Sequence, residues 1–379
     1  MSIVRETYKV RINNKIKLIS GRFLIVLSLC TGFISGCANN IPKQQNAGSF
    51  SDKSIETIAL GSCLNPHNDQ TIWQSVEATN PDLFLFLGDN VYADRLDGKW
   101  LPVATEESFK KSYHALLNNV HYQRLSKRIP VFPIWDDHDY GQNDGGAENP
   151  VAALAKDFFL SSFNLPQASE IRKRQGVYYS KIKGEEGKRV QLIFLDTRSF
   201  RTDLTKAEPG NKEGYQRYQP SSDPQQNMLG EVQWKWLEEE LNKPADLRII
   251  ASSIQVLAED HGWERWGNFP KERQRFFDLL TQTNAKGVVL VSGDRHQSGL
   301  YFKAGKTPYP LYELTASSLN MPIPNVDKEM DSTQVGYLVS EASFGLIHLD
   351  WENRALTLEI QNKANKTQRS IMVPFSEIQ

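Results

Sequence analysis

Cysteine is scarce in this chain: only three occur among 379 residues, at positions 30, 37 and 63. Cys30 lies inside an apolar N-terminal stretch and Cys37 lies just after it, so the body of the chain retains one thiol, Cys63. A single thiol cannot form an intramolecular disulfide, which excludes a disulfide-stapled scaffold. The fold therefore depends on a hydrophobic core, for which a chain of this length and near-average composition is sufficient.

Long apolar runs are also missing. The most apolar segment spans residues 23–33, and eleven residues are too few to cross a bilayer comfortably as a helix. A basic stretch precedes this segment, and Ile34-Ser35-Gly36-Cys37 comes after it. This order is typical of a secretory signal with small residues at the cleavage site. The last four residues resemble the lipobox of bacterial lipoproteins, in which the cysteine is lipidated and becomes the mature N-terminus.

We therefore expect three parts: a signal peptide over 1–36, a polar tether over 37–54 behind a lipidated Cys37, and one domain over 55–379. Ala38 rather than an aspartate comes after the cysteine, which in the lipoproteins it resembles favours sorting to the outer membrane. The expected location is the bacterial cell envelope, lipid-anchored and facing the periplasm. An uncleaved membrane anchor is the less favoured alternative.

Neither charge dominates, with 44 Lys/Arg against 45 Asp/Glu. Residues 1–36 hold six of the basic residues and one acidic residue, which leaves 38 against 44 and a net charge of about −6 for the remainder. Nucleic-acid binding needs a basic face, so we expect no stable nucleic-acid partner. Heptads, internal repeats and low-complexity tracts are absent, and the sequence implies no protein partner.

Short apolar runs alternate with helical stretches along the chain. The expected strands cover residues 55–60, 83–87, 129–135, 190–196, 248–253 and 287–292. The expected helices cover about 70–79, 106–118, 150–163, 229–243 and 271–283, and residues 311–374 are expected to add closing antiparallel strands. Such alternation predicts an α/β fold of sheets flanked by helices.

Four of the apolar runs lead directly into residues that can bind metals. The runs continue into Cys63, into Gly88-Asp89, into Asp136-Asp137-His138-Asp139, and into Gly293-Asp294-Arg295-His296. Ligands collect at the carboxyl ends of parallel strands, so these side chains are expected to converge.

Crowded carboxylates raise one another's pKa unless a cation lies among them. A cluster of Asp89, Asp137 and Asp294 therefore predicts a metal site. An inert buried thiol is a fair reading of Cys63, but its place at a strand end beside the carboxylates favours a thiolate ligand.

Six motifs occur in order along the chain: Gly-Ser-Cys at 61–63, Leu-Gly-Asp-Asn-Val-Tyr at 87–92, Trp-Asp-Asp-His-Asp at 135–139, Leu-Asp-Thr-Arg-Ser-Phe-Arg at 195–201, Leu-Gly-Glu-Val-Gln-Trp-Lys-Trp-Leu at 229–237 and Ser-Gly-Asp-Arg-His at 292–296. As a set they resemble the alkaline phosphatase D (PhoD-like) family of calcineurin-like metallophosphoesterases, over roughly residues 55–300. The resemblance implies a four-layer αββα sandwich, with two mixed β-sheets packed face to face and helices outside. It also implies hydrolysis of phosphate mono- or diesters at a metal cluster.

The resemblance implies a role for each metal-site residue. Cys63, Asp89 and Tyr92 match ligands of a ferric ion, Fe³⁺, with Asp89 bridging to a second metal. Asp294 matches a metal ligand, and Asp137 takes the place of a metal-binding asparagine. Calcium, Ca²⁺, is favoured for the second metal, with zinc or manganese (Zn²⁺ or Mn²⁺) as alternatives.

The remaining roles concern the phosphate and the leaving group. His138 matches the histidine that contacts phosphate and protonates the leaving oxygen, and Asp139 is expected to orient it. His296 matches an additional metal ligand or a phosphate contact. Arg198 either holds phosphate oxygens or forms a salt bridge that secures its loop.

Three functions remain open at this point. The favoured one is a lipid-anchored phosphomonoesterase or phosphodiesterase of the envelope. A second uses the same site on phospholipid headgroups, as a phospholipase D-like enzyme, or on teichoic-acid-type polymers. The third is a non-catalytic surface lipoprotein, which is disfavoured because a dead fold has no need of costly polar groups gathered in one place.

Overall fold

The computed structural model describes residues 54–165, 169–208, 217–324 and 331–379. The predicted signal peptide, the lipobox cysteine Cys37 and all but the last residue of the tether lie outside the described residues. Within the described ranges, no helix combines the length and the apolarity needed to cross a membrane.

The first sheet has six strands in the order β15-β14-β13-β1-β2-β5. Their bounds are β1 Thr57–Gly61, β2 Leu83–Leu87, β5 Val131–Ile134, β13 Ser343–Asp350, β14 Ala355–Asn362 and β15 Thr367–Pro374. Strands β1, β2 and β5 run parallel to one another, and β13 pairs antiparallel with β1. The carboxyl ends of these three parallel strands therefore lie on the same side of the sheet.

The second sheet has seven strands in the order β12-β10-β11-β9-β8-β7-β6. Their bounds are β6 Tyr179–Lys183, β7 Val190–Phe194, β8 Leu247–Ala251, β9 Val288–Ser292, β10 Ser298–Lys303, β11 Leu311–Thr315 and β12 Gln334–Val339. Strands β7, β8, β9 and β11 are parallel. A separate short hairpin joins β3 Arg95–Leu96 to β4 Lys99–Trp100.

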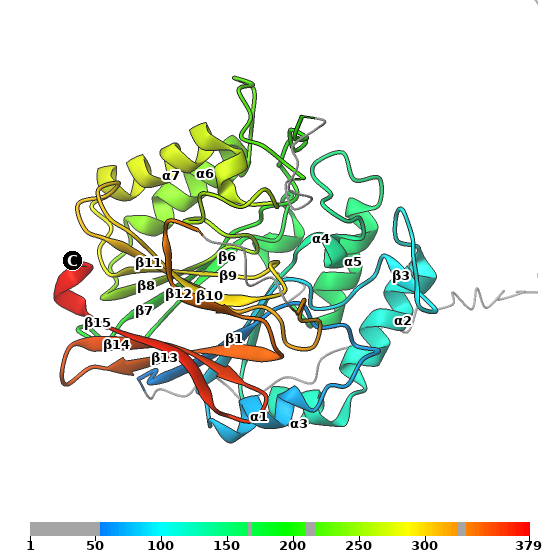
Figure 1. Ribbon diagram of the computed structural model, residues 1–379, viewed down its shortest axis with the longest axis horizontal. Helices are drawn as coiled ribbons and strands as arrows, with labels where there is room; N and C mark the ends of the chain where they lie inside the picture. Colours follow the sequence, from blue (N-terminus) through cyan, green and yellow to red (C-terminus); the bar gives the residue numbers. More distant parts are fainter. Residues whose placement is uncertain (1–53, 166–168, 209–216, 325–330) are drawn as a thin grey trace, which may run out of the picture. The chain divides into compact units, whose positions relative to one another are not determined.

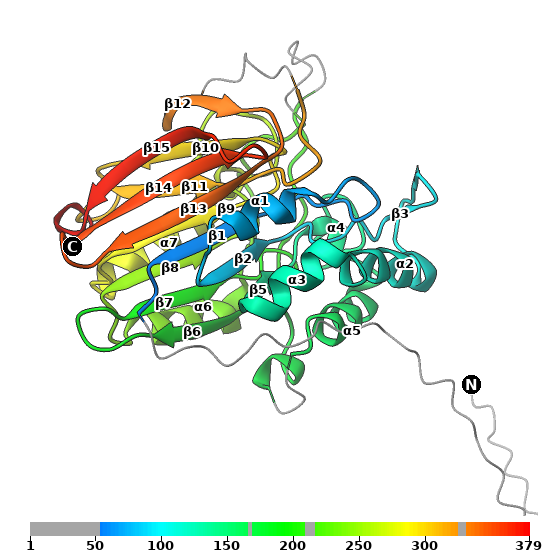
Figure 2. The ribbon, with the colours of Figure 1, turned by 90° about the horizontal axis from the view of Figure 1, so that it is seen from below.

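Helices cover the outer faces of both sheets, as Figure 1 shows: α6 and α7 lie over the second sheet and α1 and α3 over the first. Seen from below in Figure 2, α1 and α3 cross the strands of the first sheet, with α2 and α5 beside them. The helices are α1 Ile72–Ala78, α2 Glu106–Leu117, α3 Val120–Arg128, α4 Asp137–Tyr140, α5 Ala152–Ser162, α6 Gly230–Leu241 and α7 Pro270–Gln282.

Strand β2 shows why the layers stack in this order. Its five side chains are all 0% exposed. Leu83, Leu85 and Leu87 belong to the core between the sheets, whereas Phe84 and Phe86 point to the helices, where both pack edge-on against Trp73 of α1. Because side chains alternate along a strand, a run that is apolar at every position has to be buried on both faces. The prediction of a doubly buried strand is confirmed.

The predicted fold class is confirmed: two mixed sheets lie face to face with helices outside. The elements that were missed include α3, α4, β6, β10 and the β3–β4 hairpin. Only Tyr122, Leu125 and Ser126 of α3 are buried, and β6 is an edge strand with no fully buried residue, so neither carries a continuous apolar pattern.

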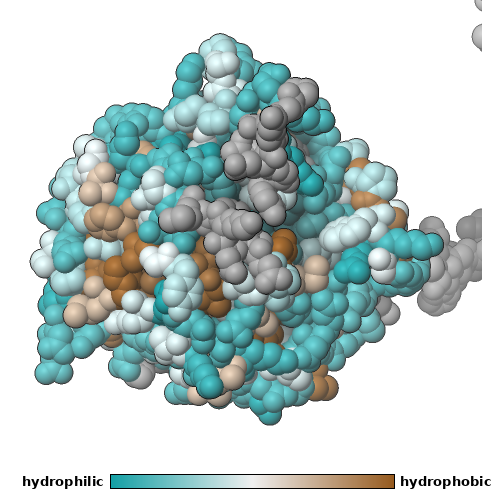
Figure 3. All heavy atoms as spheres, in the orientation of Figure 1, coloured by the Kyte–Doolittle hydropathy of each residue, from teal (hydrophilic) through white to brown (hydrophobic). Residues whose placement is uncertain are grey.

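Apolar side chains reach the surface where the edge strands of the two sheets meet. The face seen in Figure 3 is largely hydrophilic, and its apolar side chains gather on the left, in the region of β12 and β15. Val335 and Leu338 of β12 and Ile371 of β15 are partly buried against the inter-sheet core. Arg369 Nε of β15 donates to the carbonyl of Tyr337 on β12, at 3.0 Å, and joins the two edges.

Candidate metal centre

The strand ends of the two sheets meet closely, and two glycines make this possible. A Cβ on Gly293, after β9, would lie 2.6 Å from Ser62 Oγ and 2.8 Å from the carbonyl oxygen of Leu87. A Cβ on Gly88, after β2, would lie 2.5 Å from the Cβ of Asp136, which follows β5 of the same sheet, and 3.2 Å from the Cβ of Ser253, which follows β8 of the second sheet. Any larger residue at these positions would push apart the turns that carry the predicted ligands.

Four predicted ligands have an unusual backbone conformation. The φ angles of Cys63, Asp89, Asp294 and His296 are 55°, 49°, 67° and 55°, in the left-handed region that non-glycine residues seldom adopt. Such conformations cost free energy and cluster at functional sites. Their recurrence at these four turns supports a site that the rest of the fold holds in place.

Cys63, Asp89 and His296 form one group, whose donor atoms all lie within 4.8 Å of one another. The Cys63 Sγ atom is 3.4 Å from Asp89 Oδ2. Tyr92 Oη lies 3.2 Å from the same carboxylate oxygen and 3.3 Å from His296 Nε2. Sequence positions from 63 to 296 thus supply a thiol, a carboxylate, a phenol and an imidazole to one small volume.

Two further groups overlap with the first. Asp89, Asp137 and His138 form one, and Asp136, Asp137 and Asp294 form the other, again with donor atoms within 4.8 Å. Asp89 is common to the first two groups, which suits the bridging position that the resemblance implies. Asp136 is an addition, because the sequence prediction took only Asp137 from the pair.

The charges of this cluster are poorly compensated by the described residues. Burial raises the pKa of Asp89 and of Asp294 well above the usual range, and the neighbouring carboxylates raise both further. Burial and the nearby Asp89 likewise raise the pKa of the Cys63 thiol. Asp136 Oδ2 is buried and accepts no hydrogen bond from any described residue.

These features fit a metal cluster, since a cation would compensate the carboxylates and satisfy the free oxygen. The group around Cys63 offers sulfur, nitrogen and anionic oxygen, a donor set that suits a transition metal. The group around Asp294 offers only carboxylate oxygens, which suit a harder cation.

His138 is oriented by Asp94. Its Nδ1 atom lies 2.9 Å from both carboxylate oxygens of Asp94. Burial alone would lower the pKa of His138, but Asp137, Asp89 and Asp94 raise it well above its usual value. The Nδ1–H group therefore donates to Asp94, and Nε2 is left on the other side of the ring.

The prediction that Asp139 orients His138 was wrong. Asp139 accepts hydrogen bonds from the backbone N–H groups of Asn90, Val91 and Asp136, at 3.1, 3.2 and 3.0 Å. The reason is local: α4 begins at Asp137, so the third residue of this helix turns its side chain back to the cap residue Asp136. Asp139 ties the turn after β2 to the turn after β5.

Arg198 is 0% exposed and forms ion pairs with Asp136 and Glu264, which is the salt bridge of the two alternatives. Its Nε donates to Asp136 Oδ1 at 2.7 Å, and its Nη1 donates to Glu264 Oε2 at 2.8 Å. Arg201 Nε lies 3.0 Å from the other oxygen of Glu264. This buried network lies behind Asp136 and compensates part of its charge.

Besides Asp136, sequence reasoning missed three residues that act on the cluster: Asp94, Glu264 and Ser317. Asp94 carried a usable signal, because it lies two residues after Tyr92 in the same loop. Ser317 carried none: it lies just after β11, its Oγ is 3.1 Å from Cys63 Sγ, and it accepts the N–H of His296 at 2.7 Å.

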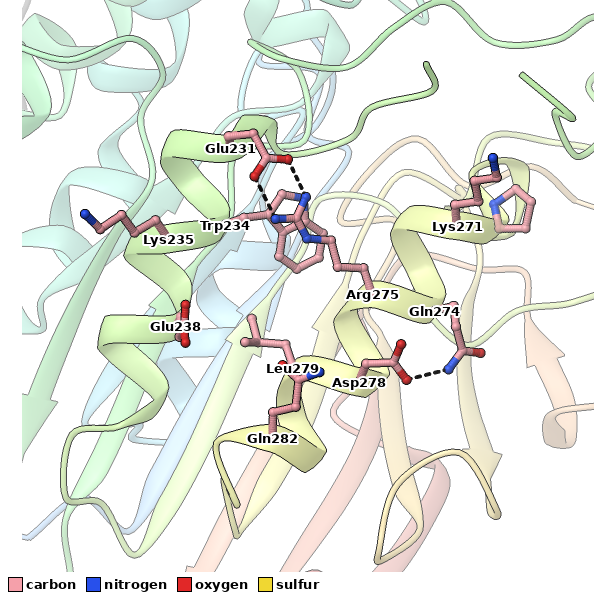
Figure 4. Close-up of a pocket in the computed structure, with 11 residues that line it drawn as sticks. Glu231, Trp234, Lys235, Glu238, Lys271, Gln274, Arg275, Asp278, Leu279 and Gln282 are labelled. Carbon is pink, nitrogen blue, oxygen red and sulfur yellow. Dashed lines mark hydrogen bonds and ion pairs between the residues drawn. The ribbon is translucent and has the colours of Figure 1, made fainter. Parts of the chain in front are cut away.

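A cavity of about 490 Å³ opens onto the cluster and is lined by Tyr92, His138, His296 and Trp100. Figure 4 shows a larger cavity, of about 680 Å³, between α6 and α7. Among its lining residues, Arg275 donates two hydrogen bonds to Glu231, and none of the metal-binding groups lines this cavity. The smaller cavity is therefore the one placed for chemistry.

The model of the PhoD-like phosphatase family matches residues 58–367. The chain belongs to this family. Alkaline phosphatase D of Bacillus subtilis (strain 168) is 22% identical over 325 residues, which cover 74% of this chain and 53% of that protein. The chain thus spans about half the length of this curated relative.

Solved structures with the same fold include PhoD itself, with a TM-score of 0.65 at 17% sequence identity, covering 88% of this chain and 69% of that chain. GAP50, described as the anchor in the inner membrane complex of Plasmodium, has a TM-score of 0.54 at 13% identity, covering 86% of this chain and 90% of that chain. At these identities the likenesses show the fold alone.

The assignment of Asp94 gives a prediction for this PhoD-like chain. Asp94→Asn removes the anionic acceptor of His138 Nδ1–H, so the downfield imidazole proton of His138 is expected to move or vanish in the NMR spectrum. Asp139→Asn leaves that proton in place. It lowers the free energy of unfolding by roughly 1–3 kcal/mol instead, because buried backbone N–H groups lose an acceptor. The reverse pattern, with the proton lost only in Asp139→Asn, would contradict the assignment.

Proposed function

We propose that the chain is a metal-dependent hydrolase of phosphate esters. The observation that carries the proposal is the overlap of three potential metal-binding groups at the converging strand ends, with His138 beside them on an open cavity. Family membership supports the same activity. The chain spans only part of its curated relative, so the activity is proposed for this chain on its own site and is not taken over from that protein.

We propose two metals within the cluster. Cys63, Asp89 and Tyr92 hold a ferric ion, with His296 beside them, and Asp89, Asp137 and Asp294 hold a divalent metal for which Ca²⁺ is favoured. Asp136 is close enough to join the second set. When bound, such a pair of metals polarises a phosphate and lowers the pKa of a water molecule.

The side chains supply positioning and a proton. Asp94 fixes the ring of His138, so its Nε2 atom is available to contact a phosphate oxygen and to protonate the leaving alcohol. Arg198 keeps Asp136 in place from the buried side. Tyr92 packs on His138 with ring centroids 4.2 Å apart, which holds the imidazole against the metal ligands.

Hydrolysis of a chromogenic phosphate monoester and of a chromogenic diester by purified protein tests this function. Asp294→Ala is expected to lower metal content and to lower turnover of the better substrate by more than the roughly 10–100-fold typical of changes at residues hydrogen-bonded to metal ligands. Asp278→Ala, an exposed aspartate of α7, is the matched control and should change neither. Full turnover in Asp294→Ala would refute the proposed site.

The ferric ion has its own test in Tyr92. A phenolate on ferric iron gives a charge-transfer band, so the iron-loaded protein should be coloured. Tyr92→Phe keeps the ring and its packing on His138, so this variant should fold, lose the band and lose most activity. Iron bound with an unchanged visible spectrum in Tyr92→Phe would exclude the phenol as a ligand. Full activity with zinc alone would remove iron from the proposal.

We also propose that Cys37 is lipidated and anchors the protein in the bacterial envelope, on the strength of the preceding Ile34-Ser35-Gly36. Cys37→Ser should abolish the incorporation of labelled fatty acid and leave a precursor or a soluble periplasmic form. Cys30→Ser, inside the signal, is the control and should be labelled normally. Label in Cys37→Ser would show that the lipobox interpretation is wrong.

A further inference from the structure

Trp100 is a large aromatic residue exposed beside the metal centre. It is 54% exposed, although tryptophan is usually well buried. Its ring centroid lies 5.3 Å from that of His138, with the planes 33° apart, and 6.0 Å from that of Tyr92. It is therefore next to the imidazole that we propose as the proton donor, and much of its surface remains free for a ligand.

The fold holds Trp100 in this place. It ends the β3–β4 hairpin, and the guanidinium of Arg95, at the start of the hairpin, lies 5.4 Å from the centre of its ring. The next residue, Leu101, donates its N–H to the carbonyl of Asp94 at 2.8 Å. The loop that carries Tyr92 and Asp94 thus also positions Trp100, and the tryptophan is exposed on a structured element.

Among the described residues, the rest of the cavity wall is uncharged. Apart from Tyr92, His138, His296 and Trp100, the cavity is lined by Asn68, Asn143, Asn320, Met321, Pro322 and Ile323. Ile323 is 48% exposed, so a second apolar side chain is also open to solvent at this cavity. Asn68 and Asn143 donate to neighbouring residues through Nδ2. This lining offers no partner for a second charge on the ligand.

We infer that Trp100 determines specificity for the organic part of the substrate, by contacting the face of a neutral, ring-bearing alcohol whose oxygen is the leaving group. This inference rests on the proposed phosphoesterase function. The phosphate lies at the metal ligands and the leaving oxygen lies at His138. The group beyond that oxygen meets the tryptophan, because Trp100 is exposed next to the imidazole, whereas Tyr92, which also packs on it, is buried.

Aromatic contacts of this kind contribute about 0.5–1.5 kcal/mol beyond the burial of area. Loss of the ring should therefore weaken binding of a ring-bearing ligand roughly 2- to 10-fold. It should leave binding of the phosphate part unchanged, since that part contacts other residues. Arg95→Ala should have a smaller effect in the same direction, because it removes only the group packed on Trp100.

Calorimetric titration of the metal-loaded protein with phenylphosphonate and with methylphosphonate tests the inference without turnover. Trp100→Ala is expected to weaken phenylphosphonate roughly 2- to 10-fold and to leave methylphosphonate unchanged, and Trp100→Phe is expected to restore most of the loss. With phenyl phosphate and ethyl phosphate as substrates, Trp100→Ala should have a higher KM for the phenyl ester alone. Tyr337→Ala is the matched control: Tyr337 is also an exposed aromatic residue with an arginine over its ring, but it lies on β12, outside the cavity.

Equal weakening of both phosphonates, or of neither, in Trp100→Ala would overturn the inference while the phosphoesterase function stands. A wild-type protein that binds neither phosphonate and hydrolyses neither ester would instead refute the proposed function, and the inference with it.

Discussion

The main physical constraint on this structure is the mutual repulsion of buried carboxylates, which the rest of the site has to compensate. Asp89, Asp136, Asp137 and Asp294 are brought to one place from the two sheets, and each is removed from the water that would stabilise its charge. Arg198 compensates one of them and His138 compensates part of two others. The remaining charge has to be met by protons or by a metal, and a cluster that also contains a thiol, a phenol and an imidazole is suited to metal.

The backbone accepts strain to make this convergence possible. Four predicted ligands adopt left-handed φ angles, and two glycines allow the turns of one sheet to approach those of the other without a Cβ between them. The sheets can sustain this because the described core between them is continuous and apolar: Leu83, Leu85 and Leu87 alone contribute three fully buried side chains to it. The packing of the two sheets thus stabilises the strained turns and the buried charged groups at the strand ends.

Around the cluster, the role of each side chain depends on how deeply it is buried. Arg198, Arg201 and Glu264 form a buried ion network behind Asp136, Asp139 ties two turns together, and Asp94 aligns the His138 ring. Trp100 lies farther along the same segment as Asp94 and lines the cavity. One short segment, residues 92–101, therefore links the proposed phenol ligand, the support of the imidazole and the wall of the cavity.

Much of this arrangement could be predicted from the sequence. Buried strands appear as apolar runs, and neighbouring parallel strands have their carboxyl ends on the same side of the sheet. The doubly buried β2, the alternation of strands and helices, and the meeting of Cys63, Asp89 and Asp137 are consequences of those two rules. Asp294 follows β9 of the second sheet, so its place beside them depends on how the two sheets pack against each other. The residue types at each strand end could be predicted in this way, but the direction of each side chain could not. Asp139 and Asp94 are both carboxylates near His138, and only the start of α4 at Asp137 decides that Asp139 faces the backbone and Asp94 faces the ring. Arg198 likewise could have faced substrate or core, and Ser317 came from a strand with no motif. Local pattern determines whether a residue is buried, but the partner of a buried polar group is chosen by elements far away in sequence, and packing alone brings them together.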